Sequence, residues 1–300
     1  MADIVSGVGL TALAAAAGRA VESTRPGRLI DDPLAAAFVA AADAPVPLPV
    51  RWPAADAEPT DQELLLLYGS GYVGLRTRFF DDYLLDARSA GIEQVVVLAA
   101  GLDTRAFRLA GLAGARLFEI DQPAVLSFKE DVLRSSGAVA RCARVALGRD
   151  LAADWVPALR AAGFATGAPT VWLAEGLLQY LSPSAEQDLF ERITSLSAPG
   201  SRLAVERTTN LSRLADDGRL REVAERTGIA MDTLVAGASR PDPSVWLHGW
   251  TLTDSPVAEV ASRYGRDLAD PGLPRPRVDL AAAGSAGPSV PSTSYLCGRR

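Results

Sequence analysis

The sequence predicts an α/β protein built on a mostly parallel seven-stranded sheet, with helices on both faces. From residue 92 onward, short apolar runs typical of strands alternate with segments of helical periodicity. The first run, 94–99, leads into a turn of small residues at Gly101, and the second ends near Asp121, 20 residues later. A buried strand, a small-residue turn and an acid at the tip of the next strand are typical of a nucleotide-binding βαβ unit.

Residues 1–90 are predicted to form a helical segment ahead of the sheet. Residues 8–24 have helical periodicity, and a second helix begins around Asp32-Pro33, because a proline suits the first helical turn. The segment 44–59 contains five prolines, which predicts an irregular loop. Apolar side chains recur at helical spacing in 60–90, so we expect a further helix there.

The sheet itself is predicted from residue 91 onward, within a single domain that spans 1–300. Its first five strands are expected at 94–99, 115–120, 143–147, 169–174 and 201–206, and the helices between them at 122–136, 154–162 and 184–197. A charged, amphipathic helical insertion then occupies 207–248. The last part, 249–300, contains two further predicted strands at 250–255 and 292–297, with a helix at 256–265 and a loop at 270–291 between them.

Composition restricts the possible partners and the compartment. The 300 residues carry a net charge of −6 with a pI of about 5.0, which leaves no basic face for nucleic acid. No run approaches the roughly 20 apolar residues of a membrane span. The apolar run at 8–17 follows Asp3 and no basic residue, so an amphipathic helix is favoured over a signal peptide. Cys142 and Cys297 are far apart, which disfavours a disulfide framework or a metal site and fits a reducing cytoplasm.

Candidate ligand-binding residues fall where the predicted strands end. Ligands of such sheets bind beyond the carboxyl ends of the strands, and these ends carry Gly101, Asp121, Asp150 and Glu175. The turn at Gly101 does not read G-x-G-x-x-G, so it would cradle a dinucleotide pyrophosphate poorly. The pattern favours a nucleoside cofactor without phosphates. An NAD-type oxidoreductase and a non-catalytic cofactor-binding protein are the alternatives.

Several motifs occur in order between residues 20 and 180. They are Glu22-Ser23-Thr24-Arg25-Pro26 with Asp32-Pro33-Leu34, Arg76-Thr77-Arg78-Phe79-Phe80-Asp81-Asp82, Ala99-Ala100-Gly101-Leu102-Asp103-Thr104-Arg105, Phe118-Glu119-Ile120-Asp121-Gln122-Pro123, Asp150-Leu151, and Trp172-Leu173-Ala174-Glu175-Gly176-Leu177. Together they resemble the leucine carboxyl methyltransferase family, particularly its bacterial branch of S-adenosylmethionine-dependent O-methyltransferases. The resemblance implies the Rossmann-like class I methyltransferase fold, with a cofactor-binding core at 91–206 and a helical lid at 207–248. Beyond residue 210 it rests on the strand pattern and on Tyr264-Gly265-Arg266.

The resemblance implies S-adenosylmethionine as the cofactor and assigns contacts to several strand-end residues. Gly101 would let the backbone approach the methionine portion. Asp121 would accept hydrogen bonds from both ribose hydroxyls, although it could also cap the helix that begins at Pro123. Asp150 and Leu151 would bind the adenine, through the carboxylate and the backbone amide respectively, unless Asp150 is only a solvated acid.

Three further positions carry expectations with alternatives. Glu175 would meet the amino group or the sulfonium side of the cofactor, or else pair with a nearby arginine. Either Arg76 or Arg78 would hold the cofactor carboxylate, which suits a bidentate guanidinium, and we favour Arg76. Relatives often carry glycine at the position of Ala99, and because alanine needs an ordinary φ, we expect a looser contact there.

The resemblance also implies methyl transfer to a carboxyl or hydroxyl oxygen of a small molecule such as a secondary metabolite. A carboxylate is already ionised at neutral pH, whereas a phenol, with a pKa of about 10, would benefit from a general base. His248 is the only histidine, hence the candidate base, and Tyr180 is a candidate contact for the acceptor. Both have structural alternatives, a surface position for His248 and a core position for Tyr180. The scarcity of histidine favours a carboxyl acceptor.

Overall fold

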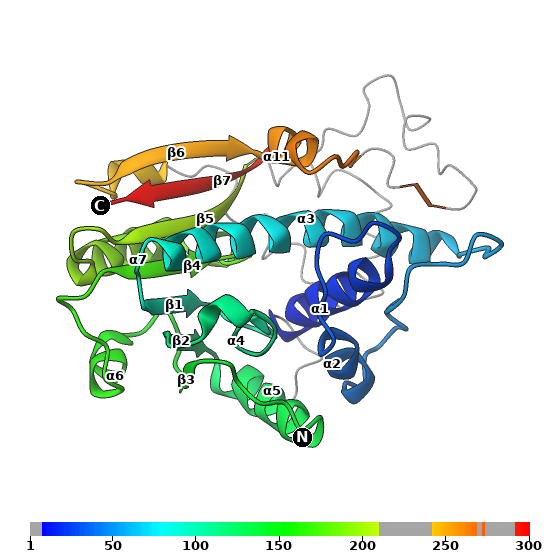
Figure 1. Ribbon diagram of the computed structural model, residues 1–300, viewed down its shortest axis with the longest axis horizontal. Helices are drawn as coiled ribbons and strands as arrows, with labels where there is room; N and C mark the ends of the chain where they lie inside the picture. Colours follow the sequence, from blue (N-terminus) through cyan, green and yellow to red (C-terminus); the bar gives the residue numbers. More distant parts are fainter. Residues whose placement is uncertain (1–7, 210–241, 269–271, 274–291) are drawn as a thin grey trace.

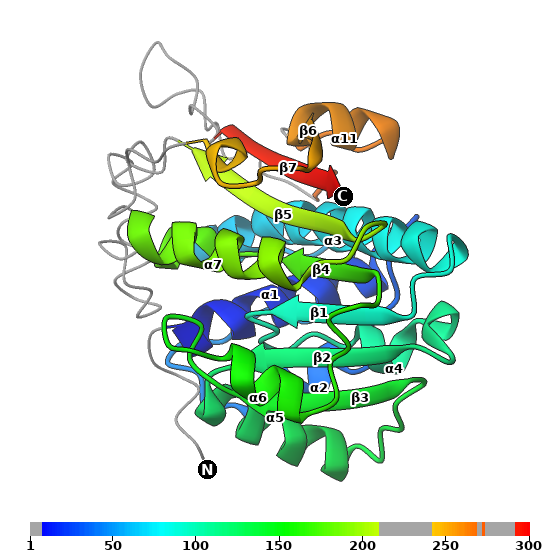
Figure 2. The same cartoon turned by 90° about the vertical axis from the view of Figure 1, so that its left-hand side faces the viewer.

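A central sheet of seven strands organises the fold, which a computed structural model describes for residues 8–209, 242–268, 272–273 and 292–300. The strands are β1 (Gln94–Leu98), β2 (Arg116–Asp121), β3 (Ala143–Gly148), β4 (Thr170–Ala174), β5 (Arg202–Thr209), β6 (Thr251–Pro256) and β7 (Ser292–Arg299). Their order in the sheet is β3-β2-β1-β4-β5-β7-β6, and β7 runs antiparallel to both of its neighbours, whereas the other pairs are parallel. Figure 2 shows the strands one above another, with β7 near the top and β3 at the bottom.

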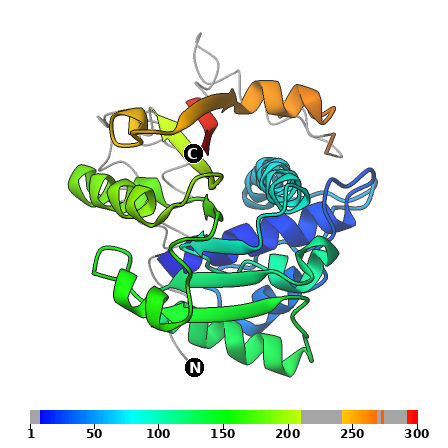
Figure 3. The same ribbon diagram turned by 60° about the vertical axis from the view of Figure 1, so that its left-hand side comes forward.

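Helices cover both faces of this sheet. They are α1 (Val8–Thr24), α2 (Ala35–Ala41), α3 (Asp61–Ser89), α4 (Arg105–Arg108), α5 (Pro123–Ser135), α6 (Val156–Ala161), α7 (Pro183–Leu196) and α11 (Val257–Arg263), with 3-10 turns at Ala110–Leu112, Leu178–Tyr180 and Pro243–Val245. Figure 3 shows α3 nearly end-on, with the sheet between it and α7. None of the described helices is long and apolar enough to cross a membrane.

The side chains of β1 explain why the sheet has two apolar layers. All five residues of β1 are buried, and successive side chains of a strand point to opposite faces. Val95 and Val97 belong to the cluster that contains the apolar residues of α3 and α11. Val96 and Leu98 belong to the cluster that contains those of α6 and α7. A continuous apolar run is therefore what a parallel strand covered on both sides requires.

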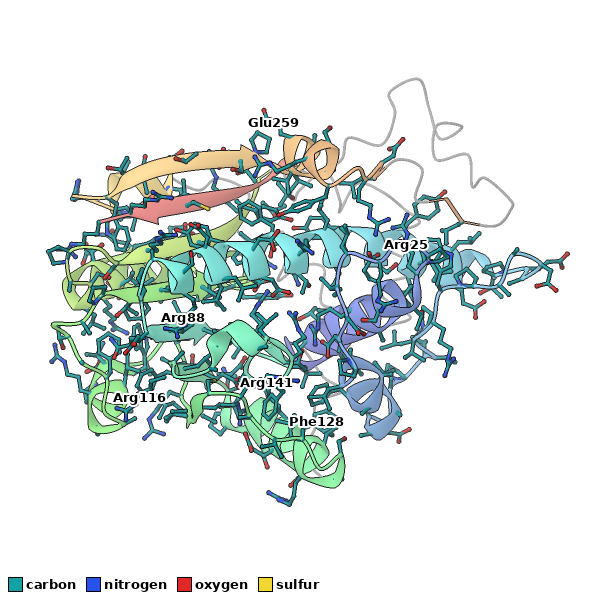
Figure 4. All side chains as sticks on the ribbon, in the orientation of Figure 1. Arg25, Arg88, Arg116, Phe128, Arg141 and Glu259 are labelled. Carbon is teal, nitrogen blue, oxygen red and sulfur yellow. The ribbon has the colours of Figure 1, made fainter. Side chains whose placement is uncertain are left out.

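The N-terminal helices add a further layer beside the carboxyl ends of the strands (Figure 1). Helix α3 begins with a capping box, in which the side chain of Thr60 accepts from the amide of Glu63 and the Glu63 side chain accepts in return. Helix α1 packs closely on α3, since a Cβ added at Gly18 would lie 2.9 Å from the Cβ of Val73. Phe128 of α5, labelled in Figure 4, packs on Phe38 of α2 with ring centroids 6.5 Å apart.

The C-terminal motif Tyr264-Gly265-Arg266 ties the end of α11 to the N-terminal half. Tyr264 Oη donates to Asp82 Oδ2 at 2.8 Å, and the same oxygen accepts from Arg78 Nε at 2.9 Å. Arg266 Nη2 donates to Oε1 of the buried Glu22 at 2.5 Å. Motifs that are some 180 to 240 residues apart therefore meet in contacts that hold the chain together.

The strand and helix predictions of the sheet region are confirmed, with ends that shift by one to three residues. The main difference is at β5, which continues to Thr209 although the sequence placed residues from 207 onward in the insertion. These residues pair with the long β7, whose partner register extends to Thr209↔Ser292. The predicted insertion helix at 211–236 and most of the predicted loop at 270–291 lie outside the described residues.

Candidate active site

A cavity of about 690 Å³ opens where β1, β2 and β4 end, between these strand ends and the helices α1 and α3. Eight of the residues singled out from the sequence line it: Arg76, Ala99, Gly101, Asp121, Asp150, Leu151, Glu175 and Tyr180. The strand-end residues meet here because the carboxyl ends of neighbouring parallel strands share one edge of the sheet. Arg76 comes from α3, which borders the same edge.

The turn after β1 has an unusual backbone conformation. Gly101 has φ of +48°, which glycine adopts without a steric penalty, but Ala99 also has a positive φ, of +50°. The expectation that Ala99 needs an ordinary φ is therefore wrong. A left-handed conformation costs an L-residue roughly 1–2 kcal/mol, so the surrounding structure must impose it on Ala99. A hydrogen bond from the Ala100 amide to the Ile120 carbonyl, at 3.2 Å, holds the turn against β2.

Asp121 links the ends of β1 and β2. Its Oδ2 accepts from the Gly101 amide at 2.5 Å, and its Oδ1 accepts from the Gln122 amide at 2.6 Å. The alternative role as a helix cap is not observed, because Gln122 is the N-cap of α5 and no side chain caps that position. Burial raises the pKa of Asp121, and the two backbone amides oppose this shift. A carboxylate offers about four lone-pair sites, so two remain for a ligand in the cavity.

An arginine–carboxylate cluster forms one wall of the cavity. It consists of Arg76, Arg105 and Arg108 with Asp81, Asp103, Glu175 and Glu206. Arg105 is its centre: Nε donates to Asp81 Oδ1 at 2.7 Å, while Nη1 donates to Glu175 Oε1 at 2.5 Å and to Asp103. Asp81 and Glu206 do not line the cavity, so the cluster presents three arginines and two carboxylates to it. The lining carboxylates, Asp103 and Glu175, would stabilise a cationic ligand group, and the arginines would stabilise an anionic one.

Glu175, the first residue after β4, takes part in this cluster as well as in the cavity wall. Besides the hydrogen bond from Arg105, its Oε2 lies 3.5 Å from Arg76 Nε. The alternative that Glu175 pairs with a nearby arginine is therefore observed, and it coexists with a position on the cavity surface. Burial raises the pKa of Glu175, and the charges of Arg105 and Arg76 oppose the shift.

Arg76 and Arg78 have different environments. Arg76 lines the cavity and donates through Nη1 to Glu206 Oε2 at 2.9 Å. Within the described part of the chain, its buried Nε has no hydrogen-bond partner. Arg78 instead pairs with Asp82, contacts the ring of Tyr264 and is not among the residues that line the cavity. Of the two arginines, only Arg76 is in a position to meet a ligand there.

The remaining predicted residues lie at the edges of the site or away from it. Asp150 is exposed at the cavity mouth, where its Oδ1 accepts from the Ala152 amide at 2.9 Å, and Leu151 lines the cavity beside it. Tyr180 lines the cavity, and burial raises its pKa. His248 is an exposed residue of the turn before β6 and does not line the cavity.

Uncharged residues of α1 and α3 form another part of the cavity lining. Ala12 and Ala15 of α1 face Leu66, Gly69 and Val73 of α3 along this part of the lining. A Cβ added at Gly69 would have no heavy atom within 4 Å. Glycine in a helix interior costs roughly 0.5–1 kcal/mol relative to alanine, so Gly69 leaves room in the cavity at the expense of helix stability.

Sequence reasoning missed Glu206, Tyr72 and Arg105 as parts of the site. Glu206 closes the fifth predicted strand, so the strand-end signal that found Glu175 would have found it too. Arg105 belongs to the turn motif that contains Gly101, but the adjacent sequence does not indicate that it donates hydrogen bonds to three carboxylates. Tyr72, one turn before Arg76 on α3, donates its hydroxyl to Glu206 Oε1; helical spacing from Arg76 was its only signal.

Metal chemistry has no candidate site in the part of the chain that the structure describes. Among those residues, no three His, Cys, Asp or Glu side chains are grouped so that they could hold a metal ion. The cavity wall combines carboxylates with guanidinium groups and backbone amides, which suits an organic ligand of mixed charge.

Comparisons with known proteins agree with this architecture. The profile of the leucine carboxyl methyltransferase family matches residues 12–194. A Saccharopolyspora erythraea protein, named as an S-adenosyl-L-methionine-dependent methyltransferase, is 47% identical over 274 residues, covering 89% of this chain and 92% of that protein. A Rhodococcus jostii protein of the same description is 45% identical and covers 93% of this chain and 94% of its own. A DUF574 family protein from Streptomyces avermitilis shares the fold, with a TM-score of 0.50, 15% identity, and coverage of 82% of this chain and 92% of that one.

Proposed function

The chain belongs to the leucine carboxyl methyltransferase family and is an S-adenosylmethionine-dependent methyltransferase, and we propose that it methylates a carboxyl or hydroxyl oxygen of a small molecule such as a secondary metabolite. The single observation that carries this proposal is the cavity at the strand ends, whose lining combines charged residues with uncharged residues of α1 and α3. The charged residues suit the cofactor, and the uncharged residues suit an apolar acceptor.

The charged residues of the lining fit S-adenosylmethionine. Asp121 retains lone pairs for the ribose hydroxyls, and Asp150 with Leu151 would hold the adenine at the cavity mouth. Arg76 has a buried Nε without a hydrogen-bond partner, which suits the cofactor carboxylate. When bound, the cofactor supplies a methyl group on a sulfonium, and the carboxylate of Glu175 would stabilise its positive charge.

The chain's contribution to transfer is orientation and the exclusion of water. The lining of Leu66, Val73 and the alanines of α1 would bury the body of the acceptor against the cofactor site. Holding two reactants in the correct geometry supplies several kcal/mol of the barrier reduction. The buried hydroxyls of Tyr72 and Tyr180 stay protonated because burial raises the pKa of each. The proton of Tyr72 is already donated to Glu206, so only Tyr180 would donate a hydrogen bond to the acceptor, and neither tyrosine would remove a proton from it.

Among acceptor oxygens, the observations favour a carboxyl group. His248 is exposed and does not line the cavity, and Asp103 and Glu175 are engaged by arginines. A hydroxyl acceptor would need a base in the transition state, whereas a carboxylate arrives ionised. The described cavity wall can therefore orient an ionised acceptor, but it offers no free general base to a neutral one.

Methyl transfer to matched acceptors tests the proposal. The purified protein is incubated with S-adenosylmethionine labelled in its methyl group and with carboxylic acids paired with alcohols of the same carbon skeleton. We expect label in the products of the acids and its release as methanol in mild alkali, since the product is an ester. Alkali-resistant label would indicate a hydroxyl acceptor. Label that enters only protein would overturn the small-molecule assignment.

Replacement of His248 provides a second arm of this test. His248→Ala should leave transfer nearly unchanged if the acceptor is a carboxylate. A decrease of about 100-fold or more would indicate a hydroxyl acceptor with His248 as general base. Titration with S-adenosylhomocysteine and with NAD checks the cofactor class independently, and we expect a response only to the former.

A further inference from the structure

Glu206 of β5 is the point at which three parts of the cavity wall are joined. Its carboxylate accepts hydrogen bonds from the Tyr72 hydroxyl, from Arg76 Nη1 at 2.9 Å and from the Gly176 amide at 2.6 Å. All three donors belong to residues that line the cavity, whereas Glu206 is not part of the lining, and its side chain is only 5% exposed. Glu206 therefore acts on the cavity through other residues.

The hydrogen bond to Arg76 determines where that guanidinium lies. An arginine side chain carries about 2 kcal/mol of rotamer entropy, and a fixed partner restricts it before a ligand arrives. Glu206 binds Nη1, while Nε remains without a hydrogen-bond partner, 3.5 Å from Glu175. Burial disfavours the charged form of Arg76, but Glu206, Tyr72 and Glu175 together outweigh burial and raise the pKa of Arg76. The guanidinium is therefore anchored, charged and only partly satisfied.

The hydrogen bond from Gly176 determines the course of the turn after β4. Gly176 has φ of +60°, and a Cβ added to it would lie 3.6 Å from Arg76 Nη1 and 3.8 Å from Glu206 Oε2. The turn thus approaches both side chains through its backbone. Because Glu175 precedes Gly176, the same hydrogen bond helps to fix the second carboxylate that faces Arg76.

We propose that Glu206 is a positioning residue, which holds Arg76 and the turn at Gly176 in the arrangement that receives the amino-acid portion of the cofactor. This inference rests on the proposed assignment of Arg76 to the cofactor carboxylate and not on the identity of the acceptor. It distinguishes Glu206 from a general structural acid, because its loss should affect only one end of the cofactor.

Two ligands that differ at that end provide the test. S-adenosylhomocysteine carries the amino-acid portion, whereas 5′-methylthioadenosine has the same adenine, ribose and thioether without it. By calorimetry, Glu206→Ala should weaken S-adenosylhomocysteine binding about tenfold or more, as expected for a lost hydrogen bond to a charged group. Affinity for 5′-methylthioadenosine should change by less than about twofold. Glu206→Gln retains an acceptor oxygen and should restore part of the loss.

Asp82 is a matched control, because it accepts from a tyrosine and an arginine as Glu206 does. Its partners, Tyr264 and Arg78, do not line the cavity. Asp82→Ala should therefore leave the affinity for both ligands within about twofold. Thermal unfolding identifies any variant that fails to fold. If Glu206→Ala fails to fold, the two affinities are measured with Glu206→Gln instead. A loss of affinity confined to S-adenosylhomocysteine then supports the proposal.

Arg76→Ala separates this inference from the proposed function. We expect it to weaken S-adenosylhomocysteine selectively and the Glu206→Ala change to add little in its background, since residues that act together are not additive. Additive losses, equal losses for both ligands, or no loss would overturn the role of Glu206. Full affinity in Arg76→Ala would refute the assignment of Arg76 and this inference with it. A protein that follows the expected pattern but methylates no small molecule would refute only the proposed function.

Discussion

The carboxylate of Asp121, the last residue of β2, accepts a hydrogen bond of 2.5 Å from the backbone amide of Gly101 in the turn after β1. The bond joins two strand ends that both line the cavity. Asp121 therefore shapes the turn as well as facing the cavity, and its replacement should affect the site in both ways.

Asp121→Ala should weaken S-adenosylhomocysteine binding by roughly 1.5–3 kcal/mol, the range for hydrogen bonds to charged groups. Isothermal calorimetry measures the change. Asp131→Ala is a suitable control, because Asp131 is an exposed acid of α5 that pairs with Arg134 away from the cavity. Unchanged affinity in a folded Asp121 variant would refute the assignment of this residue to the ribose.

Ala99→Gly should stabilise the protein. Glycine relieves the cost of a φ of +50°, roughly 1–2 kcal/mol for an L-residue, and adds about 0.5–1 kcal/mol of backbone entropy to the unfolded chain. The free energy of unfolding, measured in denaturant, should therefore rise by about 0.5–1 kcal/mol. Ala100→Gly is the contrasting variant: Ala100 is buried and absent from the residues of positive φ, so its change should destabilise. Equal losses at both positions would contradict the account of Ala99.

Gly69→Phe should block the part of the cavity lined by uncharged residues of α1 and α3 and spare the charged residues at the strand ends. A Cβ at this position would have no heavy atom within 4 Å, so the side chain starts in open space. We expect S-adenosylhomocysteine affinity within about twofold of the unaltered protein and a loss of methyl transfer to bulky acids. Undiminished transfer would place the acceptor elsewhere.

Two glycine-to-alanine substitutions in α3 distinguish the effect of helix propensity from the effect of close packing. Gly69→Ala should raise the free energy of unfolding by roughly 0.5–1 kcal/mol. Gly74→Ala should lower it, because its Cβ would lie 2.5 Å from Cγ of the buried Glu22. Denaturant unfolding of the two variants compares them directly, and a stabilised Gly74 variant would contradict the packing described for α1 and α3.

Asp103 should contribute stability that is lost in acid. Burial opposes its ionisation, but the charges of Arg105, Lys129 and Arg108 outweigh burial and lower its pKa from 3.8 to about 2. A carboxyl group with a lowered folded-state pKa stabilises the protein above its unfolded pKa and ceases to do so as the pH falls through its folded one. The stability difference between the unaltered protein and Asp103→Asn should thus shrink by about 2 kcal/mol from pH 5 to pH 2. A difference independent of pH would show that Asp103 does not titrate in this way.

Much of the architecture could be predicted because it depends on local patterns. Apolar runs such as 94–99 form strands buried on both faces, and a parallel sheet brings their carboxyl ends to one edge irrespective of side-chain detail. Gly101, Asp121 and Glu175 therefore reach one cavity, as expected. Asp150 reaches it less closely, since β3 ends at Gly148 and leaves Asp150 in an exposed turn.

Contacts between distant segments could not be predicted in this way. Glu206 receives its donors from residues 30, 130 and 134 positions away, and no local periodicity encodes such meetings. The conformation of Ala99 was predicted wrongly for a related reason. Its residue type favours a negative φ, while the hydrogen bonds between the turn and β2 impose a positive one.

By itself the sequence determined the order of strands and helices, the single-glycine turn and the acid at the tip of β2, and with them the class of cofactor. Only the tertiary structure decided between Arg76 and Arg78. Two residues apart on a helix of 3.6 residues per turn, their side chains point in directions about 160° apart. Which of them faces the cavity therefore depends on how α3 is rotated against the sheet, and that rotation is set by the buried contacts of Leu75, Phe79 and Phe80.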